Sequence, residues 1–94
     1  MFDAGPACAG SEPGLWFPAD DEPYARFVAR SGPALAICAG CSARSACLER
    51  ELARPMTQQD GIYGGLLPHE RVELIQARRR AAESRRRAQG RAAA

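Results

Sequence analysis

The sequence predicts an all-α fold, a small bundle of about four short helices followed by a basic C-terminal tail. Apolar residues recur at helical spacing in several short segments. Glycines and prolines separate these segments from one another. No stretch of useful length alternates apolar and polar residues, as a strand exposed on one face would.

The core that these helices can build is thin. The chain has 94 residues and is 46% hydrophobic, but much of that share is alanine. Domains of this size bury little surface and usually gain stability from a metal, disulfides or a partner. The length excludes a two-domain architecture and an enzyme with a large substrate pocket.

Charge divides the chain into two parts. The formal net charge is only +2, and all 13 basic residues are arginine. Residues 1–77 carry −4 and every large apolar side chain, whereas residues 78–94 carry +6. We therefore expect a helical domain over 1–77, which includes a glycine-rich turn at 61–65, and an arginine-rich tail over 78–94.

The first helix is expected to begin at residues 20–23, where three acidic residues precede a proline. Acidic residues and proline both favour the first turn of a helix. Tyr24, Phe27 and Val28 then follow at the spacing of one helical face. The Ser-Gly-Pro segment at 31–33 is expected to stop this helix.

Two further short helices are expected in the middle of the chain. One runs from Ala34 to about Gly40, and the next from about Ser45 to Ala53, ended by Pro55. The second of these has leucines one turn apart, as a half-buried helix requires.

A tight turn and a last helix complete the predicted order. The segment 61–65, Gly-Ile-Tyr-Gly-Gly, indicates a turn because its glycines can adopt positive φ. The last helix is expected from Pro68 through the arginines to about Gln89, with Gly90 ending it. His69, near its start, is expected to have a surface or capping role rather than to bind a metal.

The four cysteines carry the strongest chemical signal, in the spacing C-x29-C-x2-C-x5-C: Cys8, Cys38, Cys41 and Cys47. The middle two are one helical turn apart and point the same way. On a continuous helix the last would point away from them, so a break near residues 42–45 is needed. Ser42 and Ser45 are candidate N-caps for that break.

Three interpretations of these cysteines remain open on spacing alone. One is a [4Fe–4S] cluster held by four thiolates. Another is a structural zinc site in a DNA- or RNA-binding module, although such sites more often use two C-x2–4-C pairs. The third is a thiol redox pair at Cys38 and Cys41, as in a small protein disulfide reductase. In a reducing cytosol, ligand roles are more natural than two disulfides.

Targeting and catalytic patterns are absent from the sequence. The first 25 residues contain five acidic residues and no apolar segment typical of a secretory signal. The longest weakly apolar stretch, 34–39, is far shorter than the roughly 20 residues that span a bilayer. Neither a Ser/His/Asp set nor a carboxylate pair is apparent. We expect a cytoplasmic protein that is not an enzyme and has no membrane contact and no small-molecule substrate.

Taken in order, the motifs resemble those of the WhiB-like family of actinobacterial iron–sulfur transcription regulators. They are Cys8, Leu15-Trp16-Phe17-Pro18, Cys38-Ala39-Gly40-Cys41 with Cys47, Gly61-Ile62-Tyr63-Gly64-Gly65-Leu66, and a basic C-terminal segment. The resemblance covers about residues 7–90, nearly the whole chain. Tyr63 stands where the family usually has tryptophan.

The resemblance implies a cofactor and a protein partner. In this family the four cysteines bind a [4Fe–4S] cluster that is sensitive to oxygen and nitric oxide, and the helical bundle is wrapped around it. The family also binds the C-terminal domain of the primary sigma factor of RNA polymerase. The residues that take this contact role by position are Trp16, Phe17, Ile62, Tyr63, Gly64 and Gly65. The first two would also shield the cluster.

The basic tail is expected to contact promoter DNA. Two arginine triplets lie seven residues apart, and each covers much of the circumference of a helix. Arginine is a bidentate donor to phosphate, and such contacts are independent of base sequence. A regulator using them would take its promoter specificity from its partner. The expected DNA-contacting residues are Arg78, Arg79, Arg80, Arg85, Arg86, Arg87 and Arg91.

Overall fold

The computed structural model describes residues 7–93, which are mostly helical. The elements in chain order are η1 (Pro13–Leu15), α1 (Tyr24–Ala29), α2 (Gly32–Ala39), α3 (Arg44–Leu52), η2 (Met56–Gln58) and α4 (Pro68–Ala93). Across 7–93 there is no strand, only an isolated bridge between Tyr63 and Leu66. The all-α prediction is confirmed, although α4 is long rather than short.

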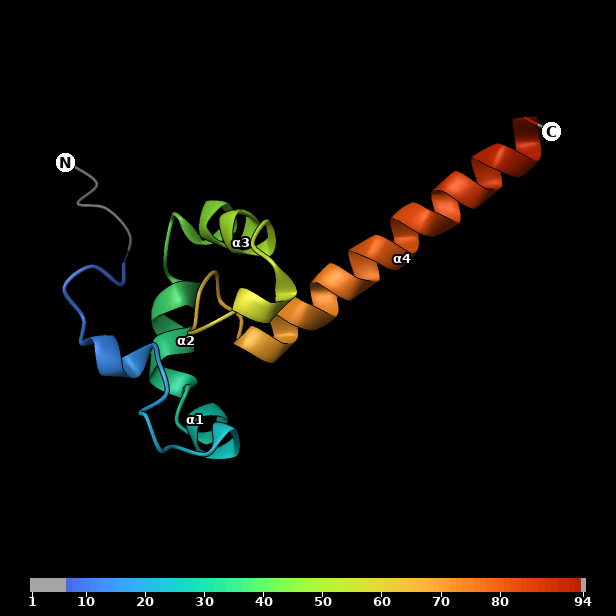
Figure 1. Cartoon of the computed structure of the whole chain (residues 1–94). Coiled ribbons are helices and arrows are strands. Elements are labelled where there is room, and N and C mark those ends of the chain that lie inside the picture. The colour runs from blue at the N-terminus through green and yellow to red at the C-terminus, as the bar shows by residue number, and fades with distance from the viewer. Residues whose placement is uncertain (1–6, 94) are drawn as a thin grey trace.

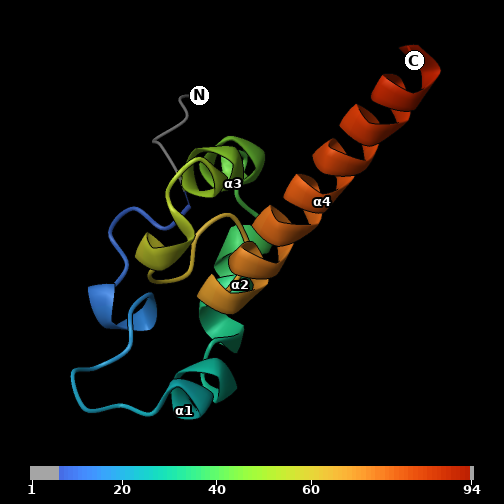
Figure 2. The same cartoon turned by 45° about the vertical axis from the view of Figure 1, so that its right-hand side comes forward.

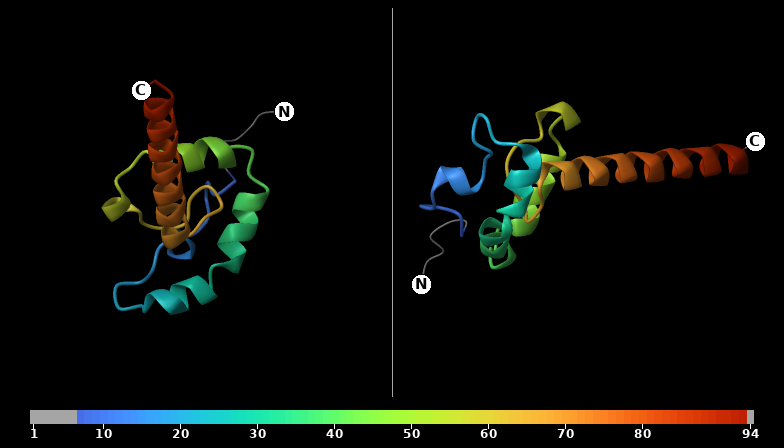
Figure 3. Two further views of the ribbon diagram at one scale, coloured as in Figure 1. Left: turned by 90° about the vertical axis from the view of Figure 1, so that its right-hand side faces the viewer. Right: turned by 90° about the horizontal axis from the view of Figure 1, so that it is seen from below.

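Two parts of unequal packing make up the molecule. The first three α-helices and the start of α4 lie together at one end of the molecule, while the rest of α4 projects outward (Figure 1). Both views of Figure 3 show this projection, and the principal extents are 55 × 41 × 18 Å. Of the helices, α3 lies beside α4 (Figure 2). None of the helices within 7–93 is both long and apolar enough to cross a membrane.

The core joins residues from segments far apart in the sequence. Phe27 of α1 and Ile62 of the glycine-rich turn are almost fully enclosed. The other members are Trp16, Ala34, Cys38 and Leu67. One of the cysteines is therefore part of the hydrophobic core, so whatever this thiol binds contacts the centre of the fold.

The expected start of the first helix needs a correction. The acidic residues at 20–22 precede α1, and Pro23 is its N-cap, so the first helical turn holds no acidic residue. Glu22 instead accepts hydrogen bonds from Arg30 Nε and Nη2, each at 2.7 Å, and from the Ala19 N–H at 3.0 Å. The pKa of Glu22 is lowered to about 2, mainly by the bonds from Arg30. This pair ties the two ends of the α1 segment together.

The break between α2 and α3 lies where it was needed, but its details differ from expectation. Gly32 and Pro33 do not merely stop α1; they form the first turn of α2, a position that proline favours. α2 ends at Ala39 and α3 begins at Arg44. The N-cap of α3 is Ala43, without a side-chain hydrogen bond, so the expected serine caps are wrong.

The last helix runs further than expected. α4 continues through Gly90 to Ala93, so Gly90 does not end it. A glycine inside an exposed helix costs up to about 1 kcal/mol and does not by itself break it. The charge boundary between residues 77 and 78 falls inside this helix, which crosses it without interruption.

Candidate metal centre

One cavity of about 210 Å³ is lined by all four cysteines. Cys8 comes from the segment before η1, Cys38 from α2, Cys41 from the α2–α3 connection and Cys47 from α3. Because α2 ends at Ala39 and a new helix begins at Arg44, Cys47 lines the same cavity as Cys38 and Cys41. Four segments of the chain thus each place one cysteine at the wall of the same cavity.

The N-terminal segment is held at this cavity through the Trp16 indole. Trp16 Nε1 donates to Ser11 Oγ at 2.8 Å, and the Ser11 hydroxyl donates to the Cys8 carbonyl. Trp16 itself is buried in the core. The position of Cys8 therefore depends on packing around a tryptophan rather than on a helix.

Backbone N–H groups surround two of the sulfur atoms. Cys41 Sγ accepts from the Ala7 N–H at 3.3 Å and from the Ala43 N–H at 3.4 Å. Burial raises the pKa of the Cys38 thiol, the other three cysteines raise it further, and the Gly65 N–H lowers it. Hydrogen bonds to sulfur stabilise the thiolate and tune iron–sulfur centres.

A single ion and a cluster place different demands on these thiols. Zinc holds sulfur at about 2.3 Å, so four ligands must crowd around one point. In the described part of the chain, no three His, Cys, Asp or Glu side chains are close enough together to hold one metal ion. All four thiols line one cavity. Four thiolates are a ligand set that suits an iron–sulfur cluster as well as a structural zinc ion.

Aromatic side chains form another wall of the cavity. Trp16, Phe17 and Tyr63 all line it. The Phe17 and Tyr63 rings meet edge to face, with centroids 6.0 Å apart and an interplanar angle of 73°. Phe17 is 39% exposed, so this pair reaches from the cavity to the surface. A partner that covered the pair would also cover one side of the thiol site.

The glycine-rich turn needs its glycines for both conformation and space. The adjacent pair Gly64 and Gly65 has positive φ, as the sequence predicted, and Gly61 does as well. A Cβ atom on Gly64 would lie 2.5 Å from Leu48 Cβ, and one on Gly61 would lie 2.6 Å from Phe17 Cε1. The turn backbone therefore rests directly on α3 and on Phe17.

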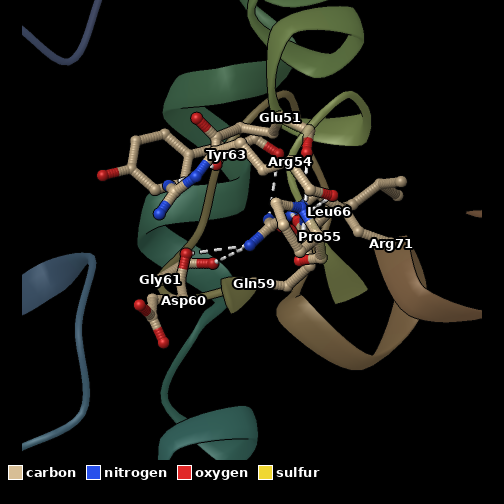
Figure 4. Close-up of polar contacts among 9 residues, drawn as sticks. All are labelled: Glu51, Arg54, Pro55, Gln59, Asp60, Gly61, Tyr63, Leu66 and Arg71. Carbon is tan, nitrogen blue, oxygen red and sulfur yellow. Dashed lines mark hydrogen bonds and ion pairs between the residues drawn. The ribbon is translucent and has the colours of Figure 1, made fainter. Parts of the chain in front are cut away.

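Arg71 is the residue that holds this turn, and sequence reasoning missed it. Its side chain is fully buried, and all five of its N–H donors are used (Figure 4). Nη2 donates to the carbonyls of Asp60 and Gly61, each at 2.8 Å. Nη1 donates to the carbonyls of Leu66 at 2.7 Å and Tyr63 at 3.4 Å. The guanidinium thus fixes the backbone on both sides of Tyr63.

The fifth donor of Arg71 connects the turn to α3. Arg71 Nε donates to Gln59 Oε1 at 2.6 Å, and Gln59 Nε2 donates to the Glu51 carbonyl at 2.7 Å and the Arg54 carbonyl at 3.1 Å. Burial lowers the pKa of Arg71. A usable sequence signal existed, since Arg71 interrupts an apolar stripe of Leu67 and Ile75 at four-residue spacing.

The expected DNA-contacting arginines all lie on α4, and none of them lines the cavity. Arg78 forms a two-point ion pair with Glu49 of α3, at 3.0 and 2.9 Å. For the other six, no carboxylate of the described residues lies within ion-pair distance. His69 is exposed and its Nδ1 shares a hydrogen bond with the Tyr24 hydroxyl at 2.7 Å, a surface role.

Comparisons with known proteins agree with the motif order. The family model described as transcription factor WhiB matches residues 3–74. The transcriptional regulator WhiD of Streptomyces coelicolor is 37% identical over 69 residues, which cover 73% of this chain. The matched region spans 60% of the length of that relative.

Proposed function

This chain belongs to the WhiB family of transcription factors, and from that premise we propose that it is an iron–sulfur regulator that docks on the primary sigma factor. In this proposal Cys8, Cys38, Cys41 and Cys47 hold a [4Fe–4S] cluster, and the arginines of α4 contact promoter DNA. The protein acts by binding, without a catalytic step, in the cytoplasm. The single observation that carries the proposal is the convergence of four thiols on one cavity beside the glycine-rich turn.

The cluster would supply a redox- and nitric-oxide-sensitive cross-link among four segments. Two sets of residues around the cavity would support such a cluster. The backbone N–H groups of Ala7 and Ala43 donate hydrogen bonds to Cys41 Sγ. Trp16 and Phe17 limit the access of water to the cavity wall. Losing the cluster would remove one cross-link from the segment that carries Cys8 and leave it held by the hydrogen bonds of Ser11 and Trp16.

The proposed sigma-factor contact involves the turn and the aromatic pair. Phe17 and Tyr63 form an edge-to-face contact that reaches the surface. Aromatic rings with a polar end are favoured at interface centres. Arg71 donates to backbone carbonyls on both sides of the Tyr63 side chain, so the turn is already ordered before a partner binds. The contact set is Trp16, Phe17, Ile62, Tyr63, Gly64 and Gly65.

The proposed DNA contact is separate from that surface. The second half of α4 projects from the molecule (Figure 1). The sequence of this helix places arginines on most of its circumference. Each phosphate that it neutralises would add roughly 0.9 to the log–log slope of binding against salt. Docking on sigma factor would therefore select the promoter, and α4 would strengthen the complex on any sequence. The set is Arg78, Arg79, Arg80, Arg85, Arg86, Arg87 and Arg91.

Anaerobic purification with iron, sulfide and zinc analysis tests the cofactor. We expect iron and acid-labile sulfide in equal amounts, and loss of both in Cys38→Ser and Cys47→Ser. Ser42→Ala, a change at an exposed position that keeps all four cysteines, is the matched control. A colourless protein with stoichiometric zinc and no sulfide would replace the cluster with a structural zinc site.

Co-purification with the C-terminal domain of the primary sigma factor tests the partner. We expect Tyr63→Ala to weaken this complex by tenfold or more, a typical loss at an interface hot spot. Tyr24→Ala is the control, because Tyr24 is an exposed tyrosine of α1 that lies outside the proposed contact set. Equal affinity for both variants would remove the turn from the interface.

A further inference from the structure

Arg44 occupies a distinct position among the arginines of residues 7–93, because it alone lines the cysteine cavity. It is the first residue of α3. In sequence it lies midway between Cys41 and Cys47, which both line the same cavity. Its side chain is long enough to place a positive charge against whatever the thiols hold.

The contact of Arg44 with Gly65 shows where that charge lies. A Cβ atom on Gly65 would lie 2.6 Å from Arg44 Nε and 3.1 Å from Arg44 Cζ. The guanidinium therefore packs against the Gly65 backbone, in space that any other residue would fill. Burial raises the pKa of the Cys38 thiol, and the backbone of the same glycine acts against that shift. Arg44 and Cys38 therefore both lie close to Gly65 at the wall of the cavity.

The charge of Arg44 has no carboxylate partner in the part of the chain that the structure describes. Arg30, Arg54 and Arg78 each form an ion pair with a glutamate. Arg44 instead faces a cavity whose wall is otherwise mainly apolar and thiol. An unpaired cation beside four thiols is suited to an anionic occupant, since the attraction between opposite charges strengthens where water is excluded.

We propose that Arg44 is the charge-compensating residue of the cysteine cavity and raises the reduction potential of the centre that the four thiols hold. The proposal rests on the cluster assigned above. Adding one electron to a thiolate-bound cluster adds one negative charge, and a nearby cation stabilises the reduced form more than the oxidised form. The side chain is partly solvated, so its effect weakens as salt increases.

Potentiometric titration of the whole cluster-loaded protein measures this effect. Dithionite supplies the electrons: each dithionite, with two water molecules, is oxidised to two sulfites and four protons and reduces two cluster-loaded proteins by one electron each. We expect Arg44→Gln to lower the reduced-to-oxidised ratio at a fixed potential about tenfold, which corresponds to about 59 mV for one electron. Arg44→Lys keeps the charge and should retain most of the wild-type potential.

Arg50→Gln is the matched control. Arg50 lies on the same helix, is also exposed, and does not line the cavity, so the variant removes the same charge at a different place. Equal potentials for Arg44→Gln and Arg50→Gln would overturn the proposal. So would a shift in Arg44→Lys as large as that in Arg44→Gln, because packing rather than charge would then be responsible.

A second measurement needs no cluster. The thiolates of the metal-free chain attack a disulfide reagent, form a mixed disulfide and expel the other half of the reagent as a thiolate. A cation at the cavity speeds attack on the anionic reagent dithiobis(nitrobenzoate) relative to the neutral reagent dithiodipyridine. We expect Arg44→Gln to lower the ratio of the two rates severalfold, with Arg50→Gln unchanged. An unchanged ratio in Arg44→Gln would contradict the proposal.

These readouts separate the two hypotheses. Absence of iron and sulfide from the wild-type protein would defeat the cluster assignment, and the reagent ratio would still judge Arg44. A normal cluster content with no specific effect of Arg44→Gln in either measurement would defeat the role of Arg44 and leave the proposed function standing.

Discussion

Arg71 near the start of α4 and Arg85 near its end lie on the same helix in opposite surroundings. Arg71 is fully buried and donates five hydrogen bonds to carbonyl oxygens of the turn and of Gln59. Arg85 is exposed on the projecting half of the helix. The side chain is the same, so its role is decided by what packs against the helix at that point. The buried arginine near the start of α4 fixes the glycine-rich turn, and the exposed arginine near its end is free for an anionic partner.

Replacing Arg71 should produce the largest effect. Arg71→Met leaves several buried carbonyls without donors, and we expect a loss of about 3 kcal/mol or more in the free energy of unfolding. Arg71→Lys should be intermediate, because lysine has three donors and no planar fork. Urea unfolding of the three proteins measures this order.

The matched change at the other end of α4 is Arg85→Met. We expect it to alter the free energy of unfolding by no more than about 0.5 kcal/mol, as for most surface substitutions. Similar losses for Arg71→Met and Arg85→Met would erase the contrast between the two ends of α4.

Glycine offers a second contrast with opposite signs. Gly64→Ala places a Cβ against Leu48 at positive φ, and we expect a loss of about 2 kcal/mol together with a displaced turn. Gly90 lies inside α4, where a Cβ atom would meet no other atom within 4 Å. Gly90→Ala should therefore stabilise the protein by up to about 1 kcal/mol. Thermal unfolding of both variants checks the two signs.

The Glu22–Arg30 pair predicts that the free energy of unfolding depends on pH. The pKa of Glu22 in the folded protein is about 2, below its ordinary value of 4.5. The stabilisation is thus complete above pH 4.5 and is lost as the pH falls through about 2. Acid unfolding of Glu22→Gln and wild type should differ at neutral pH and converge near pH 2. Curves separated by a constant amount down to that pH would exclude this pair as the cause.

The smallest structural effect is expected at the boundary between the two regions. Glu49→Gln breaks the exposed pair with Arg78, and exposed pairs contribute little to stability. Unfolding should barely change, whereas DNA affinity should rise because Arg78 is released and a negative charge is removed. If Arg78 then reaches a phosphate, the salt slope should steepen by roughly 0.9. An unchanged slope would mean that Arg78 does not reach DNA.

Most of the helical order is predictable because it depends on local spacing. The segments 24–29, 34–39 and 45–52 follow from their apolar periods and their glycine and proline boundaries. The errors fall at caps: Pro33 begins α2 rather than ending α1, and Gly90 lies within α4. Both residues have permissive as well as disruptive positions, and neighbouring turns decide between them.

The four cysteines can be identified from the sequence for a different reason. A thiolate site needs particular residues, so its members are visible in the sequence before their geometry is known. Which walls surround them is not visible there. The contacts of Arg44 with Gly65 and of Gly64 with Leu48 join residues that no local pattern relates.

The sequence alone therefore determined the helical class, the four cysteines and the separation of an acidic body from a basic tail, since each follows from residue type and short-range spacing. Only the tertiary structure decided that Arg71 is a buried donor, that Cys8 lies beside the other thiols and that Glu49 engages Arg78. The physical reason is that burial and pairing depend on which distant segments meet, and that choice is made by the whole chain packing at once.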